Sequence, residues 1–168
     1  MTVNSTATVG ATAVIKASVA ATTGYLAAEA TATITVKSAD DTTQEYVVEF
    51  TYSNNGGLST TAGEQTGTLS DISVHLENGA MNATNSDIRI YKEKLMTISA
   101  SSGTIKTIVI TSAGVSNGPG KFGNGAPSGF VVSEDGLTGT WTGSATSVGF
   151  TATDAQVRMT SIKVTYKK

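Results

Sequence analysis

The chain has 168 residues, a formal net charge of −2 and a hydrophobic content of 39%, and only 14% of its residues are charged. Nucleic acids and anionic membranes bind clustered Lys and Arg, so this charge balance disfavours both as partners. The sequence contains no cysteine, which excludes disulfides, a thiolate nucleophile and a Cys-ligated zinc site. One ordinary domain or two small ones fit this length.

Apolar residues in the first fifty positions alternate with Thr and other polar residues, which favours strands because β-branched side chains fit a pleated sheet. Strands are predicted over 12–19, 31–37 and 44–52. We expect the second and third of these to pair as a hairpin, within a small immunoglobulin-like or strand-exchanging segment that spans residues 1–53. Unpaired strand edges recruit another chain, so this segment is predicted to mediate docking or oligomerisation.

The stretch 54–67 is rich in Gly, Ser, Thr and Asn and has almost nothing to bury, so it is predicted to be a linker or long surface loop. Residues 68–168 are predicted to form a β-sandwich module. Its strands are expected over 72–76, 87–91, 95–100, 104–111, 129–133, 137–141, 147–151 and 157–166.

Two segments of this module differ from the rest in composition. The run 104–111 is the most apolar of the chain, which predicts a central strand covered on both faces. The segment 113–128 holds both prolines and is glycine-rich, which predicts an exposed loop. The complete pattern indicates an all-β fold, an antiparallel β-sandwich of jelly-roll or immunoglobulin-like type with a smaller N-terminal β segment.

The sequences YKEKLMTISASSGTIKTIVIT (91–111) and GTWTGSATSVGFTATDAQVRMTSIKVTY (139–166) resemble a β-sandwich module common in cell-surface and secreted proteins of gut Bacteroidetes. In that family a Tyr-Lys pair leads into a Thr-Ile-Ser strand, and an Arg-x-Thr-x-Ile-x-Val-Thr-Tyr strand closes the module. The sequence ATITVKSADDTTQEYVVEFT (32–51) is similar to the paired strands of immunoglobulin-like or cadherin-like repeats. Neither resemblance implies an activity, because sandwich folds host many functions.

Surface modules of the Bacteroidetes family usually follow a signal sequence or lipid anchor, whereas residues 1–21 lack the basic and apolar regions of a secretory signal. The resemblance and this difference together favour a phage virion protein that is assembled in the host cytoplasm. The expected function is a non-enzymatic structural or decoration protein of the head or tail surface with a displayed adhesive β-sandwich. The alternative is a carbohydrate-binding or adhesin module of a bacterial cell surface.

The expected partners follow from this function. They are further copies of the chain, as a homodimer or homotrimer, other virion proteins, and glycans of the host surface. No cofactor is expected, and neither nucleic acid nor a membrane is an expected partner.

The ionisable residues give no pattern typical of an enzyme. His75 is the only histidine, and without a second ligand or base a surface or packing role is favoured. Seven of the 13 acidic residues fall at predicted turns, where they are expected to cap backbone amides. They are Asp40, Asp41, Asp71, Asp87, Glu134, Asp135 and Asp154. Their spacing matches no calcium loop and offers no pair of facing carboxylates, so no catalytic or metal-binding residue is predicted.

Two aromatic residues, Phe122 and Trp141, are the candidates for contact with a ligand or partner. Trp141 could stack on a sugar ring, but a place in the core is favoured for the only tryptophan of the chain. Phe122 lies in a glycine-rich loop without apolar neighbours and is the better candidate for an exposed side chain. If both are exposed, they would form a stacking platform for a glycan.

Overall fold

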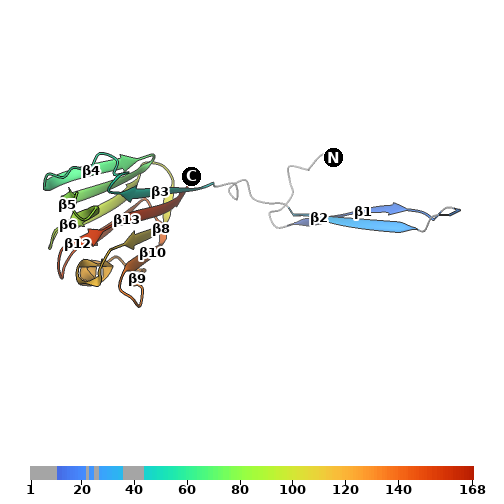
Figure 1. Ribbon diagram of the computed structural model, residues 1–168. Helices are drawn as coiled ribbons and strands as arrows, with labels where there is room; N and C mark the ends of the chain where they lie inside the picture. The colour runs from blue at the N-terminus through green and yellow to red at the C-terminus, as the bar shows by residue number, and fades with distance from the viewer. Residues whose placement is uncertain (1–10, 22, 25–26, 36–43) are drawn as a thin grey trace. The chain divides into compact units, whose positions relative to one another are not determined.

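The computed structural model describes residues 11–21, 23–24, 27–35 and 44–168. They belong to two compact units, which divide between residues 43 and 44, and each unit is described by itself. The first unit contains an antiparallel hairpin and the second an antiparallel β-sandwich (Figure 1). The predicted all-β sandwich fold is confirmed.

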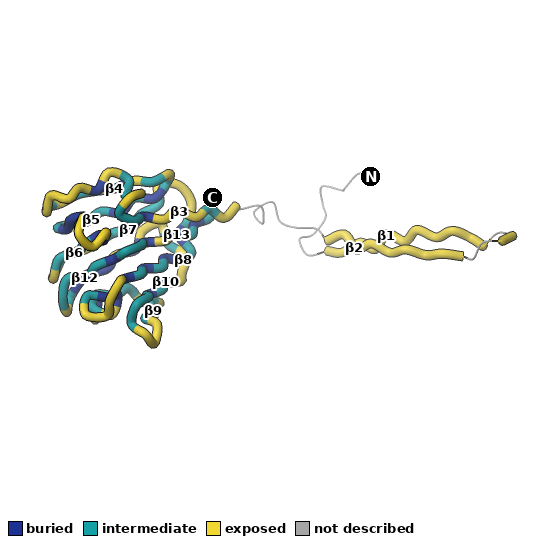
Figure 2. Tube along the Cα trace, viewed as in Figure 1, coloured by how far each residue is buried: buried dark blue, intermediate teal, exposed yellow. Residues whose placement is uncertain are grey.

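The hairpin of the first unit consists of β1 (Thr12–Val19) and β2 (Ala28–Thr35), which pair along their whole length. Every residue of both strands is exposed, whereas buried and exposed residues mix along the strands of the sandwich (Figure 2). The first strand begins and ends where the sequence predicted it.

The sandwich packs a five-stranded sheet on a six-stranded sheet. The five-stranded sheet contains, in spatial order, β3 (Glu45–Thr51), β13 (Ser161–Lys167), β8 (Thr104–Thr111), β10 (Thr138–Ala145) and β9 (Phe130–Val132). The other sheet contains β11 (Ser147–Thr151), β7 (Leu95–Ala100), β5 (Ile72–Asn82), β6 (Asp87–Ile90) and β12 (Val157–Met159), and β4 (Gly63–Leu69) also pairs with β5. All of these pairings are antiparallel.

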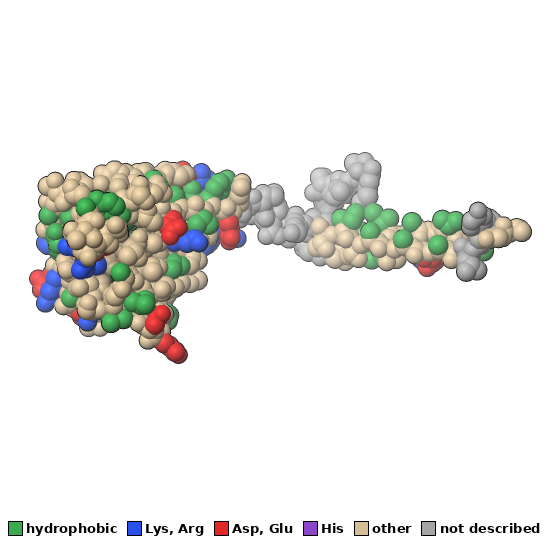
Figure 3. All heavy atoms as spheres, in the orientation of Figure 1, with side chains coloured by type: hydrophobic (Ala, Val, Ile, Leu, Met, Phe, Trp, Pro, Cys, Tyr) green, Lys and Arg blue, Asp and Glu red, His purple; other side chains and the backbone are tan. Residues whose placement is uncertain are grey.

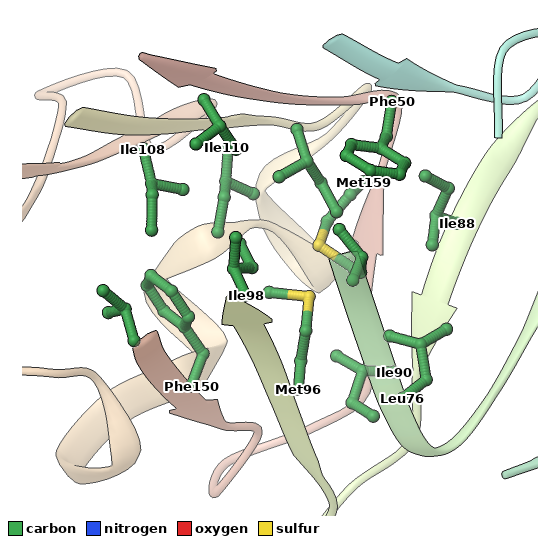
Figure 4. Close-up of a cluster of buried hydrophobic side chains, with 14 of the residues drawn as sticks. Phe50, Leu76, Ile88, Ile90, Met96, Ile98, Ile108, Ile110, Phe150 and Met159 are labelled. Atoms are coloured by element: carbon green, nitrogen blue, oxygen red, sulfur yellow. The ribbon is translucent and has the colours of Figure 1, made fainter. Parts of the chain in front are cut away.

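The core lies between the two sheets and is built from alternate side chains of both. In β5, Val74 and Leu76 are fully buried while His75 between them is partly exposed, as expected for a strand with one covered face. Ile108 of the five-stranded sheet belongs to the same buried cluster as Ile98 of the other sheet (Figure 4). This burial of apolar surface is the main stabilising contribution to the fold.

Strand β3 belongs to the sandwich, which corrects the expected N-terminal segment 1–53. It pairs with β13 from Glu45↔Lys167 to Thr51↔Ser161, and Phe50 is fully buried. The predicted hairpin between 31–37 and 44–52 is therefore not formed, and β2 pairs with β1 instead. Both strands alternate well, but only β3 carries a large aromatic residue that a sandwich core can bury.

The stretch 54–67 is a surface loop up to residue 62 and then runs into β4. It is not a linker, because it packs on the sandwich. Leu58 is 6% exposed and belongs to the core. A Cβ atom at Gly67 would fall on Leu58 and on the carbonyl oxygen of Asn55. The small residues that resemble a linker in the sequence thus permit close packing of a turn against a strand.

Strand β8 is central, as predicted, but the predicted cover on both faces is wrong, since Val109 is only partly buried. Its pairing with β13 and β10 skips Lys106. The resulting bulge brings Ile105 and Ile108, three residues apart, to the same buried face. This irregularity accounts for a run of apolar residues without simple alternation.

The single strand predicted over 157–166 is two strands, β12 and β13, which lie in different sheets. Thr160 separates them, and its backbone N–H donates to the carbonyl oxygen of Thr111 at 2.8 Å. Its hydroxyl donates to the same oxygen at 3.2 Å. The chain therefore crosses from one sheet to the other at a residue anchored to the end of β8.

Candidate functional site

Phe122 is fully buried, so its predicted exposure is wrong. It lies in η3 (Pro119–Gly125), a 3₁₀ segment within the loop expected to be exposed. Its ring packs against Phe150, with centroids 5.2 Å apart, and against Phe130 in a T-shaped arrangement, with centroids 5.9 Å apart. The apolar neighbours that sequence could not supply locally come from strands β9 and β11.

Trp141 is 6% exposed, which confirms the favoured place in the core. It lies in β10, and its indole Nε1–H donates to the carbonyl oxygen of Ser128 at 2.9 Å. Because Trp141 and Phe122 are both buried, they form no stacking platform for a glycan.

Two of the expected surface roles agree with the structure. His75 is partly exposed on β5, where its Nδ1 lies 2.9 Å from the Thr66 hydroxyl. Asp135 caps its turn by accepting hydrogen bonds from the Ser133 hydroxyl and from the backbone N–H of Leu137. The hydrogen bond from Ser133 is the main cause that holds the pKa of Asp135 below its ordinary value of 3.8, and the bond from the Leu137 backbone N–H adds to this effect. The predicted turn at residues 40–41 lies outside the described residues.

Asp71, also expected at a turn, joins a surface cluster that contains the chain end. Its carboxylate forms an ion pair with the Lys168 ammonium group and accepts a hydrogen bond from the Tyr166 hydroxyl. The Lys168 ammonium lies 4.8 Å from the centre of the Tyr46 ring, which stacks on Tyr166. The hydrogen bond from Lys168 is the main cause that lowers the pKa of Asp71 below 3.8, and the same bond raises the pKa of Lys168 above 10.5.

Asp87 has a different role from the turn cap that was expected. It is 3% exposed and begins β6. Its Oδ1 accepts from Nε of Arg89 and its Oδ2 from Nε of Arg158, each at 2.8 Å. The two arginines lie directly opposite each other in the pairing of β6 with β12. Like charges in this arrangement repel, and the buried carboxylate between them offsets part of this repulsion.

The sequence contains a signal for this cluster that the prediction missed. Asp87 and Arg89 alternate with the buried Ile88 and Ile90, and Arg158 lies between buried neighbours in β12. Charged residues at alternate positions of otherwise apolar strands share one face of the sheet. The sequence could not show that β6 and β12 are neighbours.

A pocket of about 240 Å³ adjoins this cluster, and we call it the Arg158 pocket. It is lined by Asn85, Asp87, Ala113, Gly114, Ser116, Asn117, Arg158 and Thr160. These residues come from the turn before β6 and the first residue of β6, from β12 and the crossing at Thr160, and from the loop that follows β8. The Asn85 amide lies beside Nη2 of both Arg89 and Arg158, and its oxygen accepts a hydrogen bond from each when it is turned toward them.

The hairpin presents a second candidate surface. Its register places Ala13, Ile15, Ala17 and Val19 opposite Ile34, Ala32, Ala30 and Ala28. Because alternate side chains point to opposite faces, these eight apolar residues share one face, which we call the apolar hairpin face. The other face is polar apart from Val14 and carries the Lys16–Glu29 ion pair, at 2.7 Å. Figure 3 shows hydrophobic side chains exposed along the hairpin.

Metal and membrane sites can be addressed for the described residues alone. Within ranges 11–21, 23–24, 27–35 and 44–168, no group of three His, Cys, Asp or Glu side chains is placed to hold a metal ion. Over the same ranges, no helix is long and apolar enough to cross a membrane. The chain matches no known protein family, and comparisons with curated proteins and with solved structures find no match.

Proposed function

We propose that this protein is a non-enzymatic structural subunit of a larger particle, in which the hairpin joins copies of the chain and the sandwich is displayed. The observation that carries this proposal is the apolar hairpin face. The particle we propose is a phage virion, with the protein decorating the head or tail surface. The resemblance of residues 91–111 and 139–166 to a displayed surface module supports this choice.

A two-stranded hairpin is at best marginally stable in water by itself. On the apolar hairpin face, Val19 is 68% exposed, Ile15 42% and Ile34 38%. Monomeric proteins rarely leave a contiguous apolar surface of this kind uncovered. The composition of the hairpin is therefore typical of an element whose apolar face is covered by another surface.

The occupant we propose for this face is the same face of a second copy. Its alanines leave little steric bulk between the larger side chains, so two identical faces can approach closely. Burying what remains exposed of Ile15, Val19 and Ile34 would contribute roughly 3 kcal/mol per hairpin. A dimer gains about twice that, near the lower end of the roughly 4–15 kcal/mol that association costs. We therefore expect assembly that depends on protein concentration.

One observation supports the second candidate, a carbohydrate-binding or adhesin module of a bacterial cell surface. The Arg158 pocket combines a guanidinium with amide and hydroxyl side chains, which are the groups that orient a polar ligand. This pocket replaces the aromatic platform expected from the sequence. Both candidate functions require a displayed sandwich. They differ in whether a virion or a bacterial cell surface displays it.

The assembly is tested by replacing two adjacent residues that lie on opposite faces of β1. Ile15→Lys places a charge on the apolar hairpin face, and Val14→Lys places the same charge on the polar face. The mass of the full-length chain is measured by light scattering over a range of protein concentrations. We expect a dimer for the wild type and for Val14→Lys, and a monomer for Ile15→Lys.

Two results would contradict the assembly role: a wild-type monomer at all concentrations, or equal masses for the two variants. The identity of the particle is tested separately by the neighbouring genes. Capsid and tail genes beside this one would support the virion. Genes for uptake of polysaccharides across an outer membrane would support the cell-surface alternative.

A further inference from the structure

The wall of the Arg158 pocket contains Arg158 and Asp87, which belong to a cluster with an excess of positive charge. Two guanidiniums, of Arg89 and Arg158, share the single carboxylate of Asp87. The bonds to Asp87 and Asn85 use two of the five N–H donors of the Arg158 guanidinium. In the part of the chain that the structure describes, the remaining donors of Arg158 are therefore available to an anion.

Asp87 also holds Arg158 in one orientation. The Asp87 side chain is 5% exposed and its two oxygens are each engaged at 2.8 Å, while the Arg158 side chain is 27% exposed. An arginine that is already fixed loses little further conformational freedom when a ligand binds. Its planar group suits the bidentate recognition of a carboxylate.

The other walls of the pocket offer neutral polar groups. Ser116 and Asn117 lie on η2 (Val115–Asn117), Thr160 on the crossing between β12 and β13, and Asn85 on the turn before β6. Hydroxyl and amide side chains both donate and accept hydrogen bonds, as the hydroxyl groups of a sugar do. An anion alone would need donors only, so this mixture indicates a ligand that is also rich in hydroxyl groups.

The loop that forms one wall is anchored at its start and is held by hydrogen bonds within itself. At its start, the Ser112 backbone N–H donates to the carbonyl oxygen of Leu137 at 2.9 Å, and the Ser112 hydroxyl donates to the carbonyl oxygen of Gly114 at 3.2 Å. At its end, the Gly118 N–H donates to the carbonyl oxygen of Val115 at 3.2 Å. The pocket is thus formed before a ligand arrives. Its volume of about 240 Å³ is below the roughly 300–1,000 Å³ of sites for drug-sized molecules, which suits a single sugar residue.

We propose that the Arg158 pocket binds a sugar residue that bears a carboxylate, of the uronic-acid type. The guanidinium of Arg158 receives the carboxylate, and the side chains of Asn85, Ser116, Asn117 and Thr160 receive the hydroxyl groups. This site would give the displayed sandwich a specific ligand, and only its biological role depends on the proposed function. Its chemistry lies within the sandwich and does not require the hairpin to assemble.

The proposal is tested by ligand-detected saturation-transfer NMR on the full-length chain with three probes. Sodium D-glucuronate has the ring hydroxyls and the carboxylate, D-glucose lacks the carboxylate, and sodium acetate lacks the hydroxyls. We expect glucuronate to bind at least about tenfold more tightly than either of the others, since a hydrogen bond to a charged group contributes a factor of this order. Equal binding of glucose, equal binding of acetate, or no binding of glucuronate would each overturn the proposal.

Two variants locate the binding in the pocket. Arg158→Gln removes the charge and should weaken glucuronate binding by roughly tenfold or more. Ala113→Trp fills the pocket from an exposed position without removing a polar group, so it tests the site even if Arg158→Gln fails to fold. Val115→Ala is the matched control, because Val115 lies on η2 but does not line the pocket.

Wild-type affinity in Ala113→Trp would place any binding elsewhere and overturn the proposal. The assembly variant Ile15→Lys should bind glucuronate as the wild type does. Loss of assembly and loss of sugar binding are therefore separate results.

Discussion

Replacing Phe122 by Ala should destabilise the sandwich strongly, although the sequence around this residue indicates an exposed loop. The ring is fully buried and contacts Phe130 and Phe150. Truncating a buried Phe to Ala costs about 3–5 kcal/mol, because apolar contacts are lost and a cavity remains. Domains of this size are stable by roughly 5–15 kcal/mol, so the variant loses a large part of its stability.

Urea unfolding, followed by the fluorescence of Trp141, measures this effect, since Trp141 is the only tryptophan of the chain and is buried in the same core. With a denaturant dependence of about 2 kcal/mol per M, the midpoint should fall by roughly 2 M. Lys121→Ala is the matched control. Lys121 is the adjacent residue and is only partly buried, so its replacement should change the stability by less than about 0.5 kcal/mol.

Equal midpoints for the two variants would refute the burial of Phe122. The glycine-rich loop would then present the ring to solvent, and Phe122 would return as a candidate contact for a ligand. If Phe122→Ala instead loses much stability, then any loss of ligand binding in this variant is explained by unfolding and not by removal of a ligand contact.

Two further predictions concern the sandwich. Gly79→Ala should destabilise it by about 1–3 kcal/mol, because the new Cβ would fall on the carbonyl oxygen of Arg89; Gly120→Ala, where nothing lies within 4 Å of the new Cβ, should be nearly neutral in the same urea assay. Lys168→Met should lower the urea midpoint at pH 6, where Asp71 is charged and paired. Because Lys168 lowers the pKa of Asp71, its stabilising effect is present above the ordinary pKa of 3.8 and is lost as the pH falls through the lowered value. The difference between Lys168→Met and the wild type should therefore become smaller in strong acid, and a difference unchanged at pH 2 would contradict the Asp71–Lys168 pair.

The positions of most strands could be predicted from the sequence because they depend on local composition. The bounds of β7, β8 and β11 coincide with those expected from alternation and turn residues. Strand β4 was missed because GEQTGTL has no large apolar residue before its final Leu. Its place in the sheet depends on pairing with β5, a tertiary contact that overrides weak local preference.

Pairing partners could not be predicted in the same way. The local sequence of β3 is as compatible with pairing to β2 as with pairing to β13. The pairing with β13 depends on burial of Phe50 in a core formed by residues far along the chain. The Asp87 cluster depends on the same kind of information, because Arg158 is 71 residues away from its carboxylate partner. The burial of Phe122 could not be predicted from local composition either, because its aromatic partners come from β9 and β11.

The sequence of the hairpin specifies the pairing register of its two strands only in part. Alternation predicts that β1 and β2 each have an apolar side, but the register decides whether the two sides coincide. In the observed register Ile15 faces Ala32 and Val19 faces Ala28, whereas a slip of one residue would set apolar side chains beside threonines. Register is strongly specified only where one face is buried. A surface that covers the apolar hairpin face would therefore select this register, so that the proposed assembly and the pairing of the hairpin in this register would occur together.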